Sequence, residues 1–99
     1  MREVALRAEI RRRPEAVWRT FGHETAVILP EAPAVRTLNE VGTRVWELAD
    51  GKTLGEMLDV LLNEFDVPRA ALEADVRAFL VELEARQLLE IQDRSSDGR

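Results

Sequence analysis

Residues 38–51 have the sequence LNEVGTRVWELADG, and this stretch organises the rest of the chain. Asn39 is of a type that caps helices, because its side chain accepts a hydrogen bond from a free N–H of the first turn. Gly51 is of the type that ends helices, because glycine adopts the left-handed conformation without strain. The stretch therefore predicts a helix that begins after Asn39 and ends before Gly51. Apolar residues recur along it at helical spacing: Val41, Val45, Trp46 and Leu48.

Two more amphipathic helices are predicted after this stretch. Thr53 and Glu56 form a capping box, in which each side chain satisfies a backbone N–H at the start of a helix. Pro68 is tolerated in the first turn of a helix, so it marks the start of the next one, whose apolar stripe runs from Leu72 to Leu83. The short apolar segment 88–91 is expected to form a final strand.

The N-terminal third of the chain has the patterns of extended structure. Residues 4–10 alternate between apolar and polar positions, which predicts a strand, or an arm that becomes one against a partner. Residues 16–21 and 25–29 are rich in β-formers and flank a glycine-containing turn, which predicts a hairpin. Residues 34–38 are expected to form one more short strand.

Strands followed by helices indicate an α+β fold, with a small antiparallel N-terminal sheet packed on a three-helix bundle, close to a winged-helix domain. We expect residues 1–13 to be an arm or an extra strand, residues 14–93 to be the folded domain, and residues 94–99 to be a disordered tail.

Composition excludes several classes of function. The chain has no cysteine, which excludes disulfides, thiolate metal sites and cysteine nucleophiles. Its single histidine, His23, lies in the predicted hairpin turn without a positioned partner, so we predict no catalytic residue, no metal site and no cofactor. No stretch is long and apolar enough to span a membrane, and no secretory signal precedes the domain, so a cytoplasmic protein without membrane contact is expected.

Charge argues against nucleic acid as a partner. The net charge is −5, and residues 21–99 hold sixteen acidic against eight basic side chains. The third predicted helix carries four carboxylates between residues 72 and 86 and only two arginines, whereas a helix that recognises DNA bases needs arginine, lysine, asparagine or glutamine. A winged-helix DNA-binding protein therefore remains an alternative, but the acidic charge of the predicted helices argues against it.

Residues 38–48 resemble the PqqD family, whose members have Leu-Asn, a glycine three residues on, then a β-branched residue and tryptophan. Residues 53–56 are similar to the start of the family's second helix, residues 75–83 to its third helix, and residues 14–21 to its first strand. The resemblance covers about residues 14–91.

This resemblance implies a non-catalytic domain that recognises ribosomally made precursor peptides. It implies that the leader of the precursor adds as a strand beside residues 34–38, in a groove walled by the third helix, and is presented to a modifying enzyme of the radical S-adenosylmethionine type. Pyrroloquinoline quinone synthesis is one such pathway, and another peptide product is equally compatible. The peptide-binding residues that we expect are Ala34, Val35, Arg36, Thr37, Leu38, Asp75, Ala78, Phe79 and Glu82.

Two charge preferences are expected of this groove: Asp75 and Glu82 would choose basic positions of the peptide, and Arg36 an acidic one.

A structural or oligomerisation module is the remaining alternative, in which the N-terminal arm is exchanged between the protomers of a homodimer.

Overall fold

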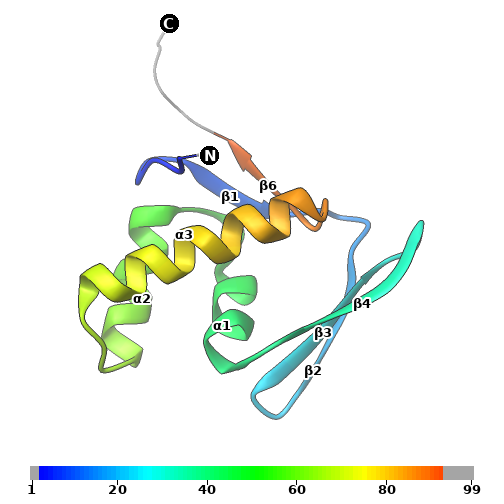
Figure 1. The fold of residues 1–99 in the computed structure, drawn as a ribbon, viewed down its shortest axis with the longest axis horizontal. Coiled ribbons are helices and arrows are strands. Elements are labelled where there is room, and N and C mark those ends of the chain that lie inside the picture. The colour runs from blue at the N-terminus through cyan, green and yellow to red at the C-terminus, as the bar shows by residue number, and fades with distance from the viewer. Residues whose placement is uncertain (1–2, 93–99) are drawn as a thin grey trace, which may run out of the picture.

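The computed structural model describes residues 3–92, apart from the side chains of residues 32–34, and has an α+β fold (Figure 1). The expected tail at 94–99 lies outside the described residues. The predicted class and its three helices are confirmed. Over the described part of the chain the order of elements is β1 (Glu9–Arg12), β2 (Val17–Phe21), β3 (Glu24–Leu29), β4 (Ala32–Leu38), α1 (Glu40–Leu48), β5 (Asp50–Thr53), α2 (Leu54–Glu64), α3 (Arg69–Ala85) and β6 (Leu89–Gln92).

The strands form two sheets where the sequence predicted one. Sheet A has the order β5-β1-β6, and sheet B has the order β2-β3-β4. All pairings in both sheets are antiparallel. Figure 1 shows sheet A close to the helices, while sheet B projects to one side of them.

The N-terminal segment is the centre of sheet A. The sequence left residues 1–13 as an arm or an extra strand, and the structure pairs β1 with β6 on one side and β5 on the other, with Ile10 opposite Ile91. Val4, Ala8 and Ile10 are buried, whereas Leu6 is exposed because a turn at residues 6–7 interrupts the alternation. A removable arm is therefore not what the structure shows, since burial of three apolar side chains anchors the segment in the core.

The helix starts follow the predicted caps. Asn39 accepts a hydrogen bond from the Gly42 N–H at 2.8 Å, and α1 starts at the next residue. The Thr53 and Glu56 capping box starts α2. Gly51 was expected to end the first helix, but α1 already ends at Leu48 with Ala49 as its C-cap, and Gly51, with a φ of 111°, lies within the short strand β5.

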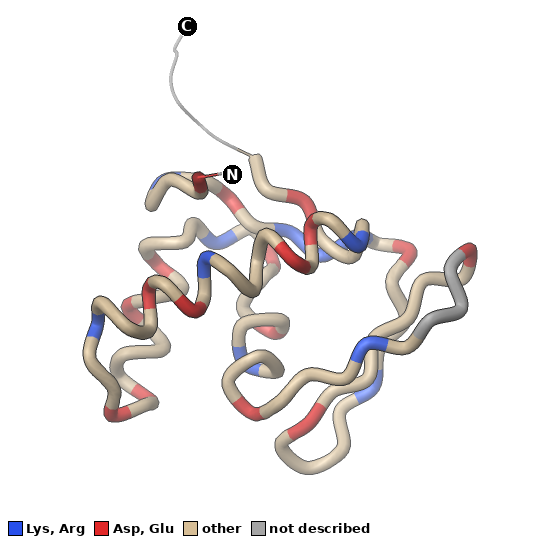
Figure 2. The backbone as a smooth tube through the Cα atoms, viewed as in Figure 1, with Lys and Arg blue, Asp and Glu red and all other residues tan. Residues whose placement is uncertain are grey.

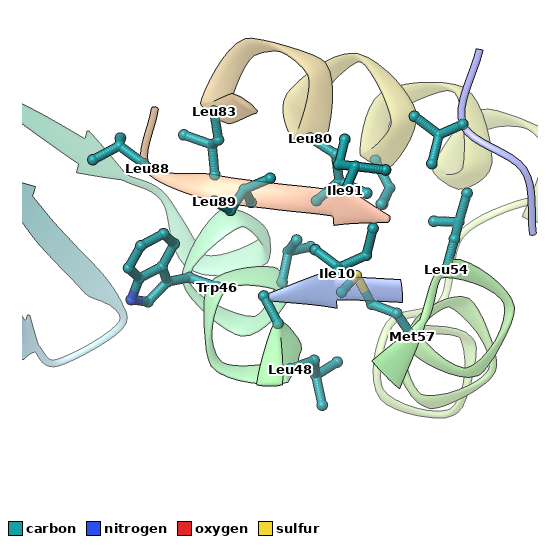
Figure 3. Packing of buried hydrophobic residues seen from close by; sticks show 14 of the residues in the cluster. Ile10, Trp46, Leu48, Leu54, Met57, Leu80, Leu83, Leu88, Leu89 and Ile91 are labelled. Atoms are coloured by element: carbon teal, nitrogen blue, oxygen red, sulfur yellow. The ribbon is translucent and has the colours of Figure 1, made fainter. Parts of the chain in front are cut away.

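The core lies between sheet A and the three helices. Figure 3 shows Leu80 and Leu83 of α3 over Leu89 and Ile91 of β6, with Ile10 on the next strand. Trp46, expected at the centre of the fold, is 0% exposed. Its ring meets Trp18 of β2 edge to face at 6.1 Å, so it joins the core to sheet B.

Arg12 ties the same junction together. Its guanidinium lies 5.2 Å from the Trp18 ring centroid and donates hydrogen bonds to the carbonyls of Trp46 and Glu47 at 2.7 and 3.0 Å. These carbonyls belong to the last turn of α1, which has no basic residue of its own. A cation there satisfies free acceptors and the negative end of the helix dipole.

Candidate peptide-binding groove

A cavity of about 540 Å³ opens between the end of β4, α1 and the N-terminal two-thirds of α3. Its floor comes from α1 and its far wall from α3. Most of its lining is apolar, which suits a site for peptide side chains. The lining residues are Arg36, Thr37, Leu38, Asn39, Val41, Gly42, Val45, Val67, Pro68, Ala71, Leu72, Asp75, Val76 and Phe79.

The structure brings together five of the nine expected site residues around this cavity: Arg36, Thr37, Leu38, Asp75 and Phe79. Glu82 lies one turn beyond Phe79 and contacts Arg36. Ala78 and Val35 are exposed and do not line the cavity. The side chain of Ala34 is outside the described part of the structure. The α1 residues were not predicted, although the spacing of Val41 and Val45 places them on one helix face.

Sheet B has two edge strands, β2 and β4, with β3 between them. β4 is the one that borders the cavity, and its outer side is referred to as the free edge. The register shows which β4 groups point outward. Phe21 pairs with Glu24 across the two-residue turn Gly22-His23, and Gly22 has a φ of 60°. A glycine at the first central position is typical of a type II′ turn, whose flanking residues exchange hydrogen bonds.

Hydrogen-bonded and non-bonded pairs alternate along an antiparallel ladder. Counting from the turn, Thr25 and Val27 of β3 direct their backbone groups away from β2 and toward Leu38 and Arg36 of β4. The backbone N–H and C=O groups of Thr37 therefore point to the free edge. The C=O of Val35 also points outward, because the next N–H, that of Arg36, faces β3, whereas the N–H of Val35 lies where the register with β3 shifts. These are the groups that a peptide strand added to β4 would pair with.

Gly42 gives Phe79 its place in the wall of the groove. A Cβ atom at Gly42 would lie 3.0 Å from Cζ of Phe79, closer than side chains normally approach. The closest neighbour of Gly42 is therefore the ring on α3 rather than a residue of the sheet. The half-buried Phe79 packs against the core and also lines the cavity, so it differs from the fully buried Trp46.

Two charges at one end of the groove are paired with each other. Nε and Nη2 of Arg36 lie 2.9 and 2.8 Å from Oε2 of Glu82, and Arg86 reaches the same oxygen from the next turn at 3.2 Å. The hydrogen bond from Arg36, more than the charge of Arg86, lowers the pKa of Glu82 below its ordinary value. Glu82 is therefore an anion that already has two cations.

Asp75 is different. Its carboxylate lines the cavity, and among residues 3–92 it makes no ion pair. The other acidic residue nearby on α3, Glu73, is bonded to Arg77, which lowers the pKa of Glu73. Asp75 is thus the charge in the groove that is open to a ligand.

No catalytic or metal-binding arrangement is found among the described residues. His23 is exposed in the hairpin turn, 3.9 Å from Glu40, and no group of three or more His, Asp or Glu residues among those described is placed to hold a metal ion. No helix within residues 3–92 is long and apolar enough to cross a membrane.

Figure 2 shows Asp and Glu positions distributed along α3, with Arg positions among them. Arg69, Arg77 and Arg86 each contact a glutamate on the same helix. Cations that are already neutralised contribute little to phosphate binding, which depends on release of counterions by free basic residues. The arrangement does not favour DNA recognition by α3.

Comparison with known proteins identifies a similar solved structure and the family of this chain. A solved structure described as TbiB1 in complex with the TbiA(beta) leader peptide matches with a TM-score of 0.75 and 28% sequence identity, over 88% of this chain and 99% of that chain. No match is found among the curated proteins. The family model for coenzyme PQQ synthesis protein D (PqqD) matches residues 24–89, which span β3 to the start of β6. The chain therefore belongs to the PqqD family.

Proposed function

We propose that this chain binds the leader segment of a ribosomally made precursor peptide as an added strand on β4 and presents it to a modifying enzyme. The observation that carries the proposal is the free β4 edge directly beside an apolar groove. A free edge supplies backbone hydrogen bonds for affinity, and a neighbouring groove supplies side-chain pockets for specificity. The matching structure contains a leader peptide bound to a protein of similar fold, which supports the same ligand class here.

The groove favours a particular pattern in the peptide. Side chains of an added strand alternate between its two faces, so every second residue would point toward α3 and α1. Apolar side chains there would contact Leu38, Val45 and Phe79. A basic residue at the same spacing would reach the carboxylate of Asp75, which has no cation of its own within the described chain.

The modifying enzyme is proposed to be of the radical S-adenosylmethionine type, and pyrroloquinoline quinone synthesis is one pathway in which such a domain would act. The protein's own part is binding and presentation, without a catalytic step. The genes adjacent to this one test the assignment: a short precursor and a radical enzyme encoded beside it support the proposal, and their absence contradicts this choice of enzyme.

A proline substitution on β4 tests strand addition directly. Thr37→Pro removes an N–H that points to the free edge, and Thr37→Ala keeps that N–H while shortening an exposed side chain. We expect calorimetry with a synthetic leader from the adjacent precursor gene to show at least about a tenfold loss of affinity for Thr37→Pro and little change for Thr37→Ala.

Arg36→Pro is the contrasting variant. The Arg36 N–H faces β3 rather than the edge, so this substitution should disrupt sheet B itself and lower the melting temperature. Equal leader affinity in Thr37→Pro and the unmodified chain would contradict strand addition and leave the helix surfaces as the site.

A further inference from the structure

Arg36 occupies the edge acceptor that an added peptide strand requires. Its Nη1 donates to the Thr37 carbonyl at 2.7 Å, and that carbonyl points to the free edge of sheet B. Its Nε and Nη2 bond Glu82 on α3. The guanidinium therefore bridges β4 and α3 at the end of the groove beyond Phe79, and its side chain is only partly exposed.

A bound strand would meet this arrangement at the Thr37 carbonyl. A backbone N–H of the peptide that pairs with Thr37 approaches the oxygen that Nη1 already bonds. That oxygen has two lone pairs, so the peptide either shares it with Nη1 or displaces Nη1. Glu82 holds the guanidinium from the opposite side through Nε and Nη2, so in either case Nη1 stays directed at the peptide.

The position of Arg36 on the ladder determines what it would meet. Because both backbone groups of Thr37 and the C=O of Val35 point outward, Arg36 stands at a non-hydrogen-bonded position of an antiparallel peptide pairing. Facing side chains are closest at such positions, with Cα atoms about 4.5 Å apart. The peptide residue opposite Arg36 would also point toward α3, as Arg36 does.

We propose that Arg36 is a specificity-determining residue that recognises a carboxylate on the peptide residue opposite it, with Glu82 as its positioning residue. This inference rests on the proposed function of the β4 edge. A carboxylate on that residue accepts from Nη1 and forms a charge-assisted hydrogen bond, which is stronger than one between neutral groups. With Asp75 on the α3 wall one turn before Phe79, the preferred peptide carries a basic and an acidic residue on its groove-facing side.

The experiment uses a displayed library of random twelve-residue peptides as its probe. Peptides selected by the unmodified chain are synthesised in two forms, with the conserved acidic residue as Glu or as Gln, and both are titrated by calorimetry. The proteins are the unmodified chain, Arg36→Gln, Glu82→Gln and Arg86→Gln. The last is the matched control, because Arg86 bonds the same Glu82 oxygen without reaching Thr37.

We expect the unmodified chain and Arg86→Gln to prefer the Glu peptide by about tenfold, the size of one hydrogen bond to a charged group. Arg36→Gln should lose the preference while binding the Gln peptide no more weakly, since its edge carbonyl is no longer occupied. Glu82→Gln should reduce the preference, because the guanidinium is no longer held in place. Circular dichroism melts check that each variant is folded.

The outcomes separate this inference from the proposed function. Binders that lose affinity in Thr37→Pro but show no Glu preference overturn the role of Arg36 and leave strand addition standing. A Glu preference that survives Arg36→Gln also overturns it. A library that yields no binder at all overturns the proposed function, and the inference with it.

Discussion

Sheets A and B are both three-stranded and antiparallel, yet they have opposite relations to the core. Sheet A buries Ile10, Leu89 and Ile91 against the helices, and both edges of its central strand are paired. Sheet B leaves large apolar residues in solvent: Val17 at 58% exposure, Phe21 at 62% and Val35 at 62%. Its buried apolar side chains, among those described, are Val27 and Leu29 of β3 and Leu38 of β4. Stability is therefore concentrated in sheet A and the helices, and the free edge of sheet B is available for a ligand.

The largest loss of stability is expected from removal of β1, the central strand of sheet A. Deleting residues 1–12 takes away the central strand of sheet A and exposes the partners of Val4, Ala8 and Ile10. Small domains have only about 5–15 kcal/mol of stability, so we expect loss of cooperative thermal unfolding by circular dichroism. Thr37→Pro, which alters only the edge of sheet B, is the control and should keep a cooperative transition. Helical signal that survives the deletion unchanged would show that sheet A is dispensable.

The second largest effect is expected at the junction of the two sheets. Trp46→Ala removes a fully buried ring that contacts Trp18, and such large-to-small core changes cost about 3–5 kcal/mol. Phe21→Ala removes an aromatic ring of sheet B that is largely in solvent, and exposed sites of this kind change stability by about 0.5 kcal/mol or less. Urea denaturation of both variants measures the difference. Equal destabilisation would mean that the exposed end of sheet B contributes to stability as much as the buried junction with α1 does.

Local signals explain what the sequence predicted well. The caps at Asn39 and Thr53 lie within three residues of the groups they bond, so a short stretch of sequence contains all the information. The β4 strand and the α3 wall were also predictable from their patterns and from the family resemblance. The long-range contacts that position β4 and α3 relative to each other could not be predicted from these local patterns.

Long-range pairing explains what was missed. Ile10 pairs with Ile91 at the other end of the chain, so alternation alone could not distinguish an arm from a central strand. Arg36 and Glu82 are 46 residues apart, and each was expected to select a charge on the peptide before their mutual pairing was visible. Only the fold determines which charges neutralise each other and which, like Asp75, stay open.

A smaller and more selective effect is expected for Gly42→Ala. The added Cβ would press on Phe79 at 3.0 Å and on Oδ1 of the Asn39 cap at 3.2 Å. The ring should move into the groove, while the gain of about 1 kcal/mol from alanine in a helix offsets strain at the cap. We expect leader affinity to fall several-fold with a stability change of about 1 kcal/mol or less.

Gly55→Ala is the matched control, since its Cβ would make ordinary contacts with Leu6 far from the groove. Equal affinity losses in both would show that the effect is not local to Phe79.

The smallest effect concerns pH and compares an ion pair of the helical body with the one at the groove. Glu64 of α2 bonds Arg44 of α1 at 2.8 Å, and Glu82 of α3 bonds Arg36 of β4. In each case the hydrogen bond from arginine lowers the carboxyl pKa in the folded chain. A carboxylate with a lowered pKa stabilises the fold above its unfolded pKa of about 4.3, and this contribution is lost as the pH falls through the lower folded value. Melting temperatures should therefore drop between about pH 5 and pH 3, and Glu64→Gln and Glu82→Gln should each make that drop shallower. Both carboxylates are largely solvated, so each change should be small.

The two variants should differ in what they affect. Because Glu64 joins two helices of the core whereas Glu82 holds only the edge of sheet B, Glu64→Gln should have the larger effect on melting and Glu82→Gln the larger effect on peptide preference. A melting curve of Glu82→Gln with the greater change would show that sheet B is held to α3 as firmly as the helices are held to each other.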